Sequence, residues 1–163
     1  LYNRRFFLER LEWECDRATR YQRPFACLMV DLNGFKQVND RLGHHTGDFV
    51  LKRVAQELSL ALRQSDILAR FGGDEFVIAL PETTPAQAEA VAEKLRGVRI
   101  EAPEGAARGV NAVTLSVGMS RLEPNRERAQ DLLDAADRSL YAWKARLKSA
   151  PMDRPVPWPN RKG

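Results

Sequence analysis

The sequence predicts an α/β (α+β) fold in which helices flank a mixed central β-sheet. Three patterns lead to this prediction. An apolar run without alternation at 25–30 indicates a strand buried on both faces. Two adjacent glycines between apolar runs at 67–80 indicate a β-hairpin. Helical periodicity before, between and after these segments supplies crossover helices, so the predicted order is α-β-α-α-β-β-α-β-α.

Hydrophobic period and flanking residues define each element. Asn3 is a candidate N-cap of the first helix, and residues 84–87 form a capping box with proline at the first helical position. The predicted elements are a helix over 7–18, a strand over 25–30 that ends at Asp31, a helix over 35–42 closed by Gly43, a helix from near Gly47 to Leu62, a hairpin over 67–80, a helix over 84–95, a strand over 113–119 and a helix over 133–147. Residues 101–109 are expected to form a loop.

The chain length fits one domain. A chain of 163 residues that is 44% apolar and 29% charged is large enough to bury a core. We expect the domain to span residues 1–150 and the proline-rich tail 151–163, which cannot continue a helix, to be extended or disordered. No apolar run approaches the roughly 20 residues of a membrane span and no signal peptide opens the chain, so a cytoplasmic domain is expected.

Composition excludes several classes of site. The formal charge of +4 is modest and no Lys/Arg-rich block with interleaved aromatics occurs, so nucleic acid is not an expected partner. Two cysteines and two histidines without a C-x-x-C pair argue against zinc, and Cys15 and Cys27 are expected to be buried free thiols. A glycine-rich phosphate loop of the G-x-x-x-x-G-K-[ST] type is absent, so any nucleotide is bound in another way.

The segment 70–76, Arg-Phe-Gly-Gly-Asp-Glu-Phe, places two carboxylates directly after a turn. A two-residue Gly-Gly turn requires positive φ at both glycines. Asp74 and Glu75 would then face opposite sides of the emerging strand. A turn with solubilising acids is the simplest explanation. An amphipathic hairpin does not need an acid on each face, so partners elsewhere in the chain are expected.

Asp31 is the first of these partners, because it lies where a buried strand meets a loop. If that strand lies beside the hairpin, Asp31, Asp74 and Glu75 converge at one end of the sheet. Carboxylate oxygens at this position would bind Mg²⁺ and leave coordination sites for phosphate oxygens. The alternative for Asp31 alone is a cap for the helix over 35–42.

A second group of polar residues lies between 39 and 48. Asn39 and Asp48 can pair with the edge of guanine through an amide and a carboxylate, although turn and cap roles are more common for these residue types. Nothing in the sequence requires a ligand role for His44. Lys144 and Lys148 share one face of the last helix and could contact phosphates; a solvated basic helix end is the alternative.

Several blocks of residues match a known family in order and spacing. They are Asn3-Arg4-Arg5, residues 31–40, Leu42-Gly43-His44, Gly47-Asp48, Gly72-Gly73-Asp74-Glu75-Phe76 preceded by Arg70, Ser116-Val117-Gly118, and residues 136–141 with Lys144. In these blocks the chain resembles the GGDEF family of diguanylate cyclases. The resemblance covers residues 1–148, and this many ordered blocks exclude chance similarity.

The resemblance implies a palm-like fold similar to nucleotide cyclases and polymerases. The implied reaction joins two GTP molecules into cyclic di-GMP with release of two pyrophosphates, with Mg²⁺ as cofactor or Mn²⁺ as an alternative. One site binds one GTP, so a homodimer is needed and a lone monomer should be nearly inactive. The implied roles are catalysis by Asp74, Glu75 and Arg70; metal binding by Asp31, Leu32 (carbonyl), Asp74 and Glu75; and substrate binding by Phe35, Lys36, Asn39, His44, Asp48, Gly72, Gly73, Lys144 and Lys148.

A further motif, Arg63-Gln64-Ser65-Asp66, stands five residues before the glycines. In residues and spacing it matches the inhibitory product-binding motif of the family. Arg63 and Asp66 would bind the guanine and phosphate of cyclic di-GMP. Lys94 or Arg96 is a candidate for a second basic contact. An Arg-Asp pair that closes a helix before a strand is the alternative.

The chain departs from the family pattern at three places. Asn33 stands where Asp is frequent, and Leu147-Lys148-Ser149 replaces the usual Gly-Arg-Asn, which removes the bidentate grip of arginine on phosphate. The Asp-x-Leu-Thr segment that usually precedes Asn3 is missing. We therefore expect a domain slightly truncated at its N-terminus, from a longer protein with an upstream sensor or regulatory domain.

Two other functions compete with an active cyclase. A catalytically inactive receptor would bind GTP at a degenerate site, or cyclic di-GMP through Arg63 and Asp66. Such a receptor has no need of both hairpin acids. A plain interaction domain leaves the convergent acids unexplained. The intact Gly-Gly-Asp-Glu-Phe run at 72–76 favours the enzyme.

Overall fold

The computed structural model describes residues 1–101, 112–123 and 128–149. Its elements are α1 (Arg4–Tyr21), β1 (Phe25–Asn33), α2 (Phe35–Leu42), α3 (His44–Ala61), β2 (Ile67–Arg70), β3 (Glu75–Pro81), α4 (Pro85–Arg96), β4 (Arg99–Glu101), β5 (Ala112–Arg121) and α5 (Ala129–Ser149). Each predicted helix and strand is present, and β4 is an addition to the predicted order. The predicted tail at 151–163 and nearly all of the predicted loop at 101–109 lie outside the described residues.

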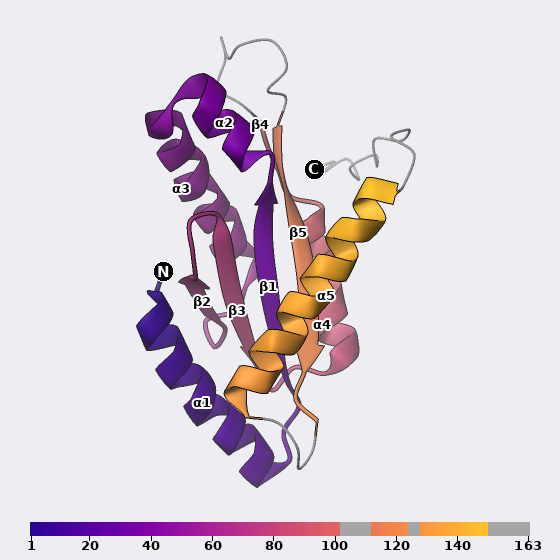
Figure 1. The fold of residues 1–163 in the computed structure, drawn as a ribbon. Helices are drawn as coiled ribbons and strands as arrows, with labels where there is room; N and C mark the ends of the chain where they lie inside the picture. The colour runs from indigo at the N-terminus through magenta and orange to yellow at the C-terminus, as the bar shows by residue number, and fades with distance from the viewer. Residues whose placement is uncertain (102–111, 124–127, 150–163) are drawn as a thin grey trace, which may run out of the picture.

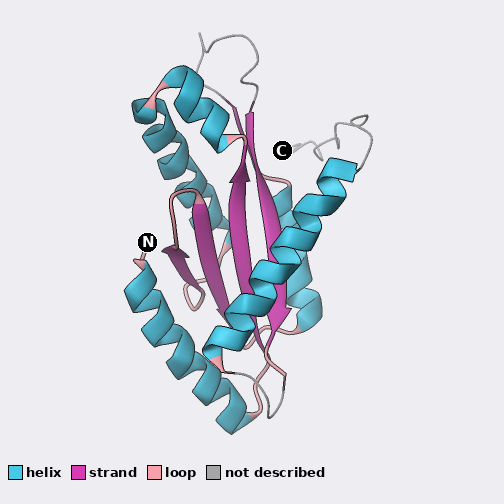
Figure 2. Ribbon diagram, viewed as in Figure 1, coloured by secondary structure: helices cyan, strands magenta, loops and turns pink. Residues whose placement is uncertain are grey.

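One five-stranded sheet forms the centre of the fold, in the order β2-β3-β1-β5-β4. Neighbouring strands are antiparallel, and an isolated parallel bridge joins Tyr2 to Ala69 at the outer edge of β2. Helices α1 and α5 lie on one face of the sheet and α2, α3 and α4 on the other (Figures 1 and 2). The predicted α/β fold, a central sheet flanked by helices, is confirmed, but the named strands pair only antiparallel, so the expected mixed sheet is reduced to the isolated parallel bridge.

The two faces of β1 contribute to two separate cores. Its residues 25–30 are all buried, as the unbroken apolar run predicts. The even-numbered residues pack with α2, α3 and α4, and the odd-numbered residues pack with α1 and α5. Cys15 and Cys27 are buried free thiols, as expected. In the described residues no helix has the length and hydrophobicity needed to cross a membrane.

Two boundaries differ from the predictions because tertiary contacts extend the elements. β1 does not end at Asp31 but continues to Asn33, since β5 pairs with it as far as Asn33. Helix α3 begins at His44 rather than near Gly47. The predicted caps are confirmed: Asn3 accepts a hydrogen bond from the first turn of α1, and the capping box at 84–87 opens α4.

The loop between β2 and β3 comprises residues 71–74 and is not a two-residue turn. The glycines with positive φ in the described residues are Gly34 and Gly43. The predicted positive φ at Gly72 and Gly73 is therefore wrong. A longer loop spreads the reversal of the chain over more residues, so neither glycine has to adopt the left-handed region.

Helix α5 approaches β5 so closely that only glycine fits at position 118. A Cβ on Gly118 would overlap the backbone of Leu140 and Ala136. One residue further along β5, the Met119 N–H donates to Ser139 Oγ at 3.0 Å. These contacts fix the position of α5 along the sheet, and therefore the positions of the side chains near its C-terminal end.

Candidate functional site

The strand register brings the predicted carboxylates together. Asp31 of β1 stands opposite Glu75 of β3 and opposite Ser116 of β5. Directly opposed residues of antiparallel strands share a face, so both acids lie on the side covered by α5. Asp74 precedes Glu75 in the loop, and the Leu32 N–H donates to the Asp74 carbonyl oxygen at 3.2 Å. This bond ties the loop to β1.

The three carboxylates repel one another in a partly buried site. Burial raises the pKa of Asp31; the ammonium of Lys144 opposes this effect and the charge of Asp74 adds to it. Burial also raises the pKa of Glu75. The charges of Asp31, Asp74 and Asp137 raise the pKa of Glu75 further. The acids outnumber the one lysine that lowers their pKa values, and an excess of negative charge of this kind favours the binding of a cation.

Lys144 is a cation that already contacts this cluster. Its Nζ lies 2.7 Å from Asp31 Oδ2, and the Asp31 side chain is only 14% exposed. Such a charge-assisted bond is stronger than an exposed ion pair. Lys144, which is predicted to bind phosphate, thus forms an ion pair with Asp31, which is predicted to bind metal. The side chain of Lys148, the other predicted phosphate contact on α5, lies outside the described part of the chain.

Asn33, which stands where the family pattern favours Asp, bonds to two side chains of β5. Its Nδ2 donates to Thr114 Oγ1 at 3.1 Å, and its Oδ1 accepts from Ser116 Oγ at 2.8 Å. The amide joins these hydroxyls without adding another negative charge beside Asp31. No role for Thr114 or Ser116 is predicted from the sequence, although strand alternation places both on one face of β5.

The donor chemistry of the cluster fits Mg²⁺, a hard cation that takes oxygen ligands. The raised pKa values of Asp31 and Glu75 reflect burial and repulsion that a divalent ion would relieve. The side chains do not form a closed cage, since no group of three or more His, Cys, Asp or Glu in the described residues could hold an ion as arranged. The acids therefore fit the ion by chemistry and charge, and their side chains must rearrange to bind it.

The residues predicted to contact guanine lie on α2 and α3, which follow β1 directly. Asn39 lies against Gly47, because a Cβ at Gly47 would overlap the amide oxygen of Asn39. Gly47 is buried and Asp48, the next residue, is exposed. The α2–α3 contact therefore brings the Asn39 amide against the residue that precedes Asp48. Of the other predicted substrate contacts on these helices, Phe35 is buried, and Lys36 and His44 are exposed.

Arg70, predicted to be catalytic, bonds to the loop that precedes Glu75. Its Nε lies 3.2 Å from the carbonyl oxygens of Gly72 and Gly73, and its Nη2 donates to the Gly73 carbonyl at 2.7 Å. Gly72 is also close to Glu75, since a Cβ there would lie 2.7 Å from Glu75 Oε2, whereas Gly73 has open space. These contacts give Arg70 a part in holding the loop in shape.

The predicted product site at Arg63 and Asp66 lies in a hydrogen-bonded turn between α3 and β2. Asp66 Oδ2 accepts from the Arg63 N–H at 2.8 Å, and the Asp66 N–H donates to the Arg63 carbonyl at 3.1 Å. The Arg63 side chain is exposed. Lys94 is also exposed, but Arg96 is not available as a second contact: its side chain is 11% exposed and is paired with two glutamates of α4. That suggestion for Arg96 is wrong.

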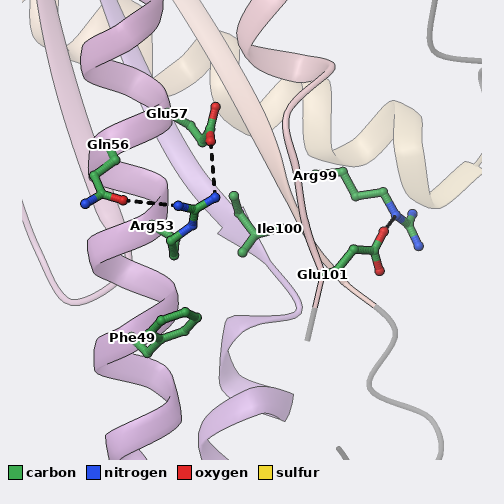
Figure 3. A pocket seen from close by; sticks show the side chains of 7 residues that line it. All are labelled: Phe49, Arg53, Gln56, Glu57, Arg99, Ile100 and Glu101. Carbon is green, nitrogen blue, oxygen red and sulfur yellow. Dashed lines mark hydrogen bonds and ion pairs between the residues drawn. The ribbon is translucent and has the colours of Figure 1, made fainter. Parts of the chain in front are cut away.

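A surface pocket of about 680 Å³ lies between α3 and β4 (Figure 3). It is lined by Phe49, Arg53, Gln56, Glu57, Arg99, Ile100 and Glu101. Its charged groups neutralise each other, since Arg53 pairs with Glu57 at 3.6 Å and Arg99 with Glu101 at 2.8 Å. None of the predicted site residues lines this pocket, so it is distinct from the carboxylate cluster.

Solved structures share this fold. The GGDEF domain of PA1120 (YfiN or TpbB) from Pseudomonas aeruginosa matches with a TM-score of 0.80 and 33% identity over 90% of this chain and 91% of that one. The GGDEF domain of DgcB from Caulobacter crescentus, solved in complex with c-di-GMP, matches with a TM-score of 0.77 and 27% identity over 89% and 84% of the two chains.

Sequence comparison agrees with the structural matches. The diguanylate cyclase DgcP of Pseudomonas aeruginosa is 38% identical over 154 residues, which are 94% of this chain and 22% of that protein. The chain spans between 20% and 34% of the length of the first curated relatives that it matches. The family model described as "Diguanylate cyclase, GGDEF domain" matches residues 1–150. The chain therefore belongs to the GGDEF-domain family of diguanylate cyclases.

Proposed function

We propose that this domain condenses two GTP molecules into cyclic di-GMP. In each of two steps a 3′-oxygen forms a bond to the α-phosphorus of the other nucleotide, and the bond from that phosphorus to pyrophosphate breaks. The observation that carries the proposal is the convergence of Asp31, Asp74 and Glu75 beside Lys144. Mutual repulsion in a partly buried place destabilises a fold, so a domain that only binds a partner gains nothing from this cluster.

Asp31, Asp74 and Glu75 would hold Mg²⁺, or Mn²⁺ as an alternative, with the Leu32 carbonyl as a further ligand. When bound, the ion lowers the pKa of the 3′-hydroxyl and neutralises charge on the α-phosphate. In the structure, one carboxylate oxygen of Asp31 is paired with Lys144 Nζ. Exchange of that contact releases the ammonium to bind a phosphate close to the carboxylates.

Asn39 and Asp48 would select guanine. The exposed carboxylate of Asp48 can accept hydrogen bonds from N1–H and the 2-amino group, and the Asn39 amide can pair with O6 or N3. Adenine offers neither the N1–H nor the 2-amino donor, so ATP would leave the Asp48 carboxylate unpaired. The remaining proposed substrate contacts are Phe35, Lys36, His44, Gly72, Gly73, Lys144 and Lys148, while Arg70 would support the catalytic loop through the glycine carbonyls.

Catalysis would need a second copy of the domain. One site binds one GTP, and in-line attack requires the two nucleotides to face each other. The proposal therefore includes a homodimer, brought together by an upstream sensor or regulatory domain of a longer cytoplasmic or membrane-anchored protein. The catalytic unit itself would be residues 1–150, the part that the family model matches.

Arg63 and Asp66 would bind cyclic di-GMP and inhibit the enzyme. The exposed guanidinium of Arg63 can form two parallel hydrogen bonds with a phosphate or with the O6 and N7 atoms of guanine. Lys94, also exposed, would supply the second positive charge. The complex of the related DgcB domain with c-di-GMP supports the ligand class.

The test uses the chain fused to a dimeric coiled coil, with GTP and Mg²⁺, and measures cyclic di-GMP by chromatography. We expect product from the fused wild-type chain and at least about 100-fold less from Asp74→Ala. Glu9→Gln is the matched control, because Glu9 is an exposed acid of α1 that pairs with Arg5 of the same helix at 3.1 Å. If the fused wild-type chain binds GTP but forms no product, the enzymatic proposal is wrong and a receptor function takes its place.

A further inference from the structure

Arg96 links the two helical layers around the edge of the sheet. It lies at the end of α4, which Figure 1 shows on the far side of the sheet from α5. Its guanidinium carbon nevertheless lies 4.0 Å from the ring centre of Trp143, a residue of α5. Between the two helices, Arg96 donates to the carbonyl oxygen of Val117 in β5, from Nε at 3.3 Å and from Nη2 at 2.9 Å. One side chain thus contacts α4, β5 and α5.

The guanidinium is held in a fixed orientation. Its Nη1 lies 2.6 Å from a carboxylate oxygen of Glu89 and 2.6 Å from one of Glu93. The Arg96 side chain is only 11% exposed, whereas the side chains of Glu89 and Glu93 are 47% and 62% exposed. All three nitrogens of the guanidinium have a partner, and its carbon lies over the Trp143 ring, an arrangement that favours a cation–π contact.

The stack lies one residue from the candidate site. Trp143 precedes Lys144, whose Nζ contacts Asp31 at 2.7 Å. Earlier along α5, the close approach at Gly118 sets the height of the helix on β5. Towards the C-terminal end of the helix, the Trp143 ring contacts the guanidinium of Arg96, and Lys144 forms an ion pair with Asp31. The direction of the Lys144 side chain therefore depends on how this turn is held.

We propose that Arg96 is a positioning residue for Lys144. By holding the ring of Trp143, it keeps the last turns of α5 in the rotation that directs Lys144 to the carboxylate cluster and, with nucleotide bound, to the phosphates. This inference rests on the proposed function, because the phosphate role of Lys144 belongs to it. Arg96 itself touches neither the nucleotide nor the reacting atoms.

The test measures the dissociation constant of the 163-residue chain for a GTP analogue with a methylene between the α- and β-phosphorus atoms, by calorimetry with Mg²⁺. Arg96→Met keeps the aliphatic stem and removes the planar cation, so we expect roughly threefold to tenfold weaker binding. Trp143→Ala should weaken binding to a similar extent, and Trp143→Phe, which keeps an aromatic face, should restore most of the affinity. Arg99→Met is the matched control: Arg99 pairs with Glu101 on the surface and should be neutral.

A double-mutant cycle separates action through Lys144 from a general loss of stability. In a Lys144→Ala background, Arg96→Met should cause no further loss of affinity. The inference is overturned if Arg96→Met lowers the affinity equally in the wild-type and Lys144→Ala backgrounds. It is also overturned if Lys144→Ala lowers the affinity and Arg96→Met does not. Both outcomes leave the proposed function intact. A neutral Lys144→Ala shows instead that the proposed phosphate role is wrong, and the inference with it. If Arg96→Met does not fold by circular dichroism, the Trp143→Ala and Trp143→Phe pair is used in the same cycle.

Discussion

The carboxylate cluster and the Arg63–Asp66 turn are two charged regions built in opposite ways. Asp31 and Glu75 come from neighbouring strands, and the register of the sheet sets them opposite each other. Burial and neighbouring charge raise the pKa values of both acids. Arg63 and Asp66 are three residues apart in one turn, joined through a backbone N–H, and the Arg63 side chain extends into solvent. The carboxylate cluster depends on pairing between strands that are distant in sequence, and its acids repel one another. The Arg63–Asp66 turn is formed by neighbouring residues of opposite charge and contains little electrostatic repulsion.

This difference predicts opposite responses to mutation. Removal of a charge from the cluster should relieve repulsion, so the fold gains stability while the proposed activity is lost. Removal of the Arg63 charge should leave stability unchanged, because that side chain contributes to ligand binding and not to packing. Four sets of variants, one of them also measured as a function of pH, test this contrast, from the largest expected effect to the smallest.

Glu75→Gln should give the largest effect. We expect cyclic di-GMP formation by the dimeric fusion to fall at least about 100-fold, because the proposed metal and hydroxyl contacts of the carboxylate are lost. We expect the melting temperature to rise, because the repulsion from Asp31, Asp74 and Asp137 disappears. Calorimetric unfolding and product chromatography measure the two effects. A lower melting temperature would show that the charge of Glu75 does not destabilise the cluster.

The stability gain of Glu75→Gln should depend on pH. The folded-state pKa of Glu75 is raised above its ordinary value of 4.5, so the folded chain binds this proton more tightly than the unfolded chain does. The contribution of Glu75 to the wild-type free energy of unfolding therefore decreases as pH rises from the ordinary pKa through the raised one. Glutamine does not titrate, so the difference between variant and wild type should be largest near neutral pH and smallest near about pH 4. Denaturant titrations across this range test it, and a difference independent of pH would contradict it.

Gly118→Ala should cost about 2 kcal/mol or more of unfolding free energy, because a methyl group would overlap the backbone of α5. That backbone cannot move without shifting the whole helix, including Lys144. Gly73→Ala is the matched control, since a Cβ there meets open space and stability should change little. Urea unfolding gives both values. Equal losses in the two variants would show that α5 is not tightly fixed on β5.

Gly47→Ala should affect binding more than stability. The added methyl group would overlap the end of the Asn39 side chain, which can rotate away, and would lie 3.3 Å from Phe35 Cζ, which must give way slightly. Alanine in a helix interior recovers about 1 kcal/mol relative to glycine. We expect a near-neutral melting temperature and about tenfold weaker GTP binding, matching Asn39→Ala. Calorimetry on both variants tests this, and unchanged affinity would remove Asn39 from the proposed guanine site.

Arg63→Ala should give the smallest change in stability, within about 0.5 kcal/mol, while more cyclic di-GMP accumulates in a long progress curve. Asp66→Ala should also relieve inhibition but cost about 1 kcal/mol, because the Arg63 N–H loses its acceptor. Thermal unfolding and product measurements distinguish the two variants. A progress curve identical to wild type for Arg63→Ala would show that the turn does not bind product.

Local signals in the sequence predict much of this fold. Caps such as Asn3 and the box at 84–87, and apolar runs such as 25–30, involve residues close in sequence, and the structure confirms them. The convergence of Asp31 with the hairpin acids also follows from the sequence, because strand ends tend to meet at one edge. Their proposed roles in metal binding and catalysis remain predictions.

Features that depend on tertiary contacts could not be predicted in this way. β1 passes Asp31 because β5 on its other side supplies hydrogen bonds that no local pattern encodes. β4 has only three residues, which is too short for a recognisable period. From its position at a helix end, Arg96 would be expected to have an exposed side chain that could bind a ligand. Its partners nevertheless include Val117 and Trp143 from distant segments. Polar residues that are satisfied by distant partners are therefore the ones that sequence patterns describe least well.

The Arg96 contact has a consequence for solubility as well as for Lys144. β4 pairs with β5 at 112–114, and no other described strand pairs with the remainder of that border of β5. An uncovered strand border is a template on which another chain can add a strand and start aggregation. Here the Val117 carbonyl is taken by Arg96 and the Met119 N–H by Ser139. Side chains from two helices thus occupy backbone groups that an incoming strand would need, and the sheet is closed to further growth at this point without an additional strand.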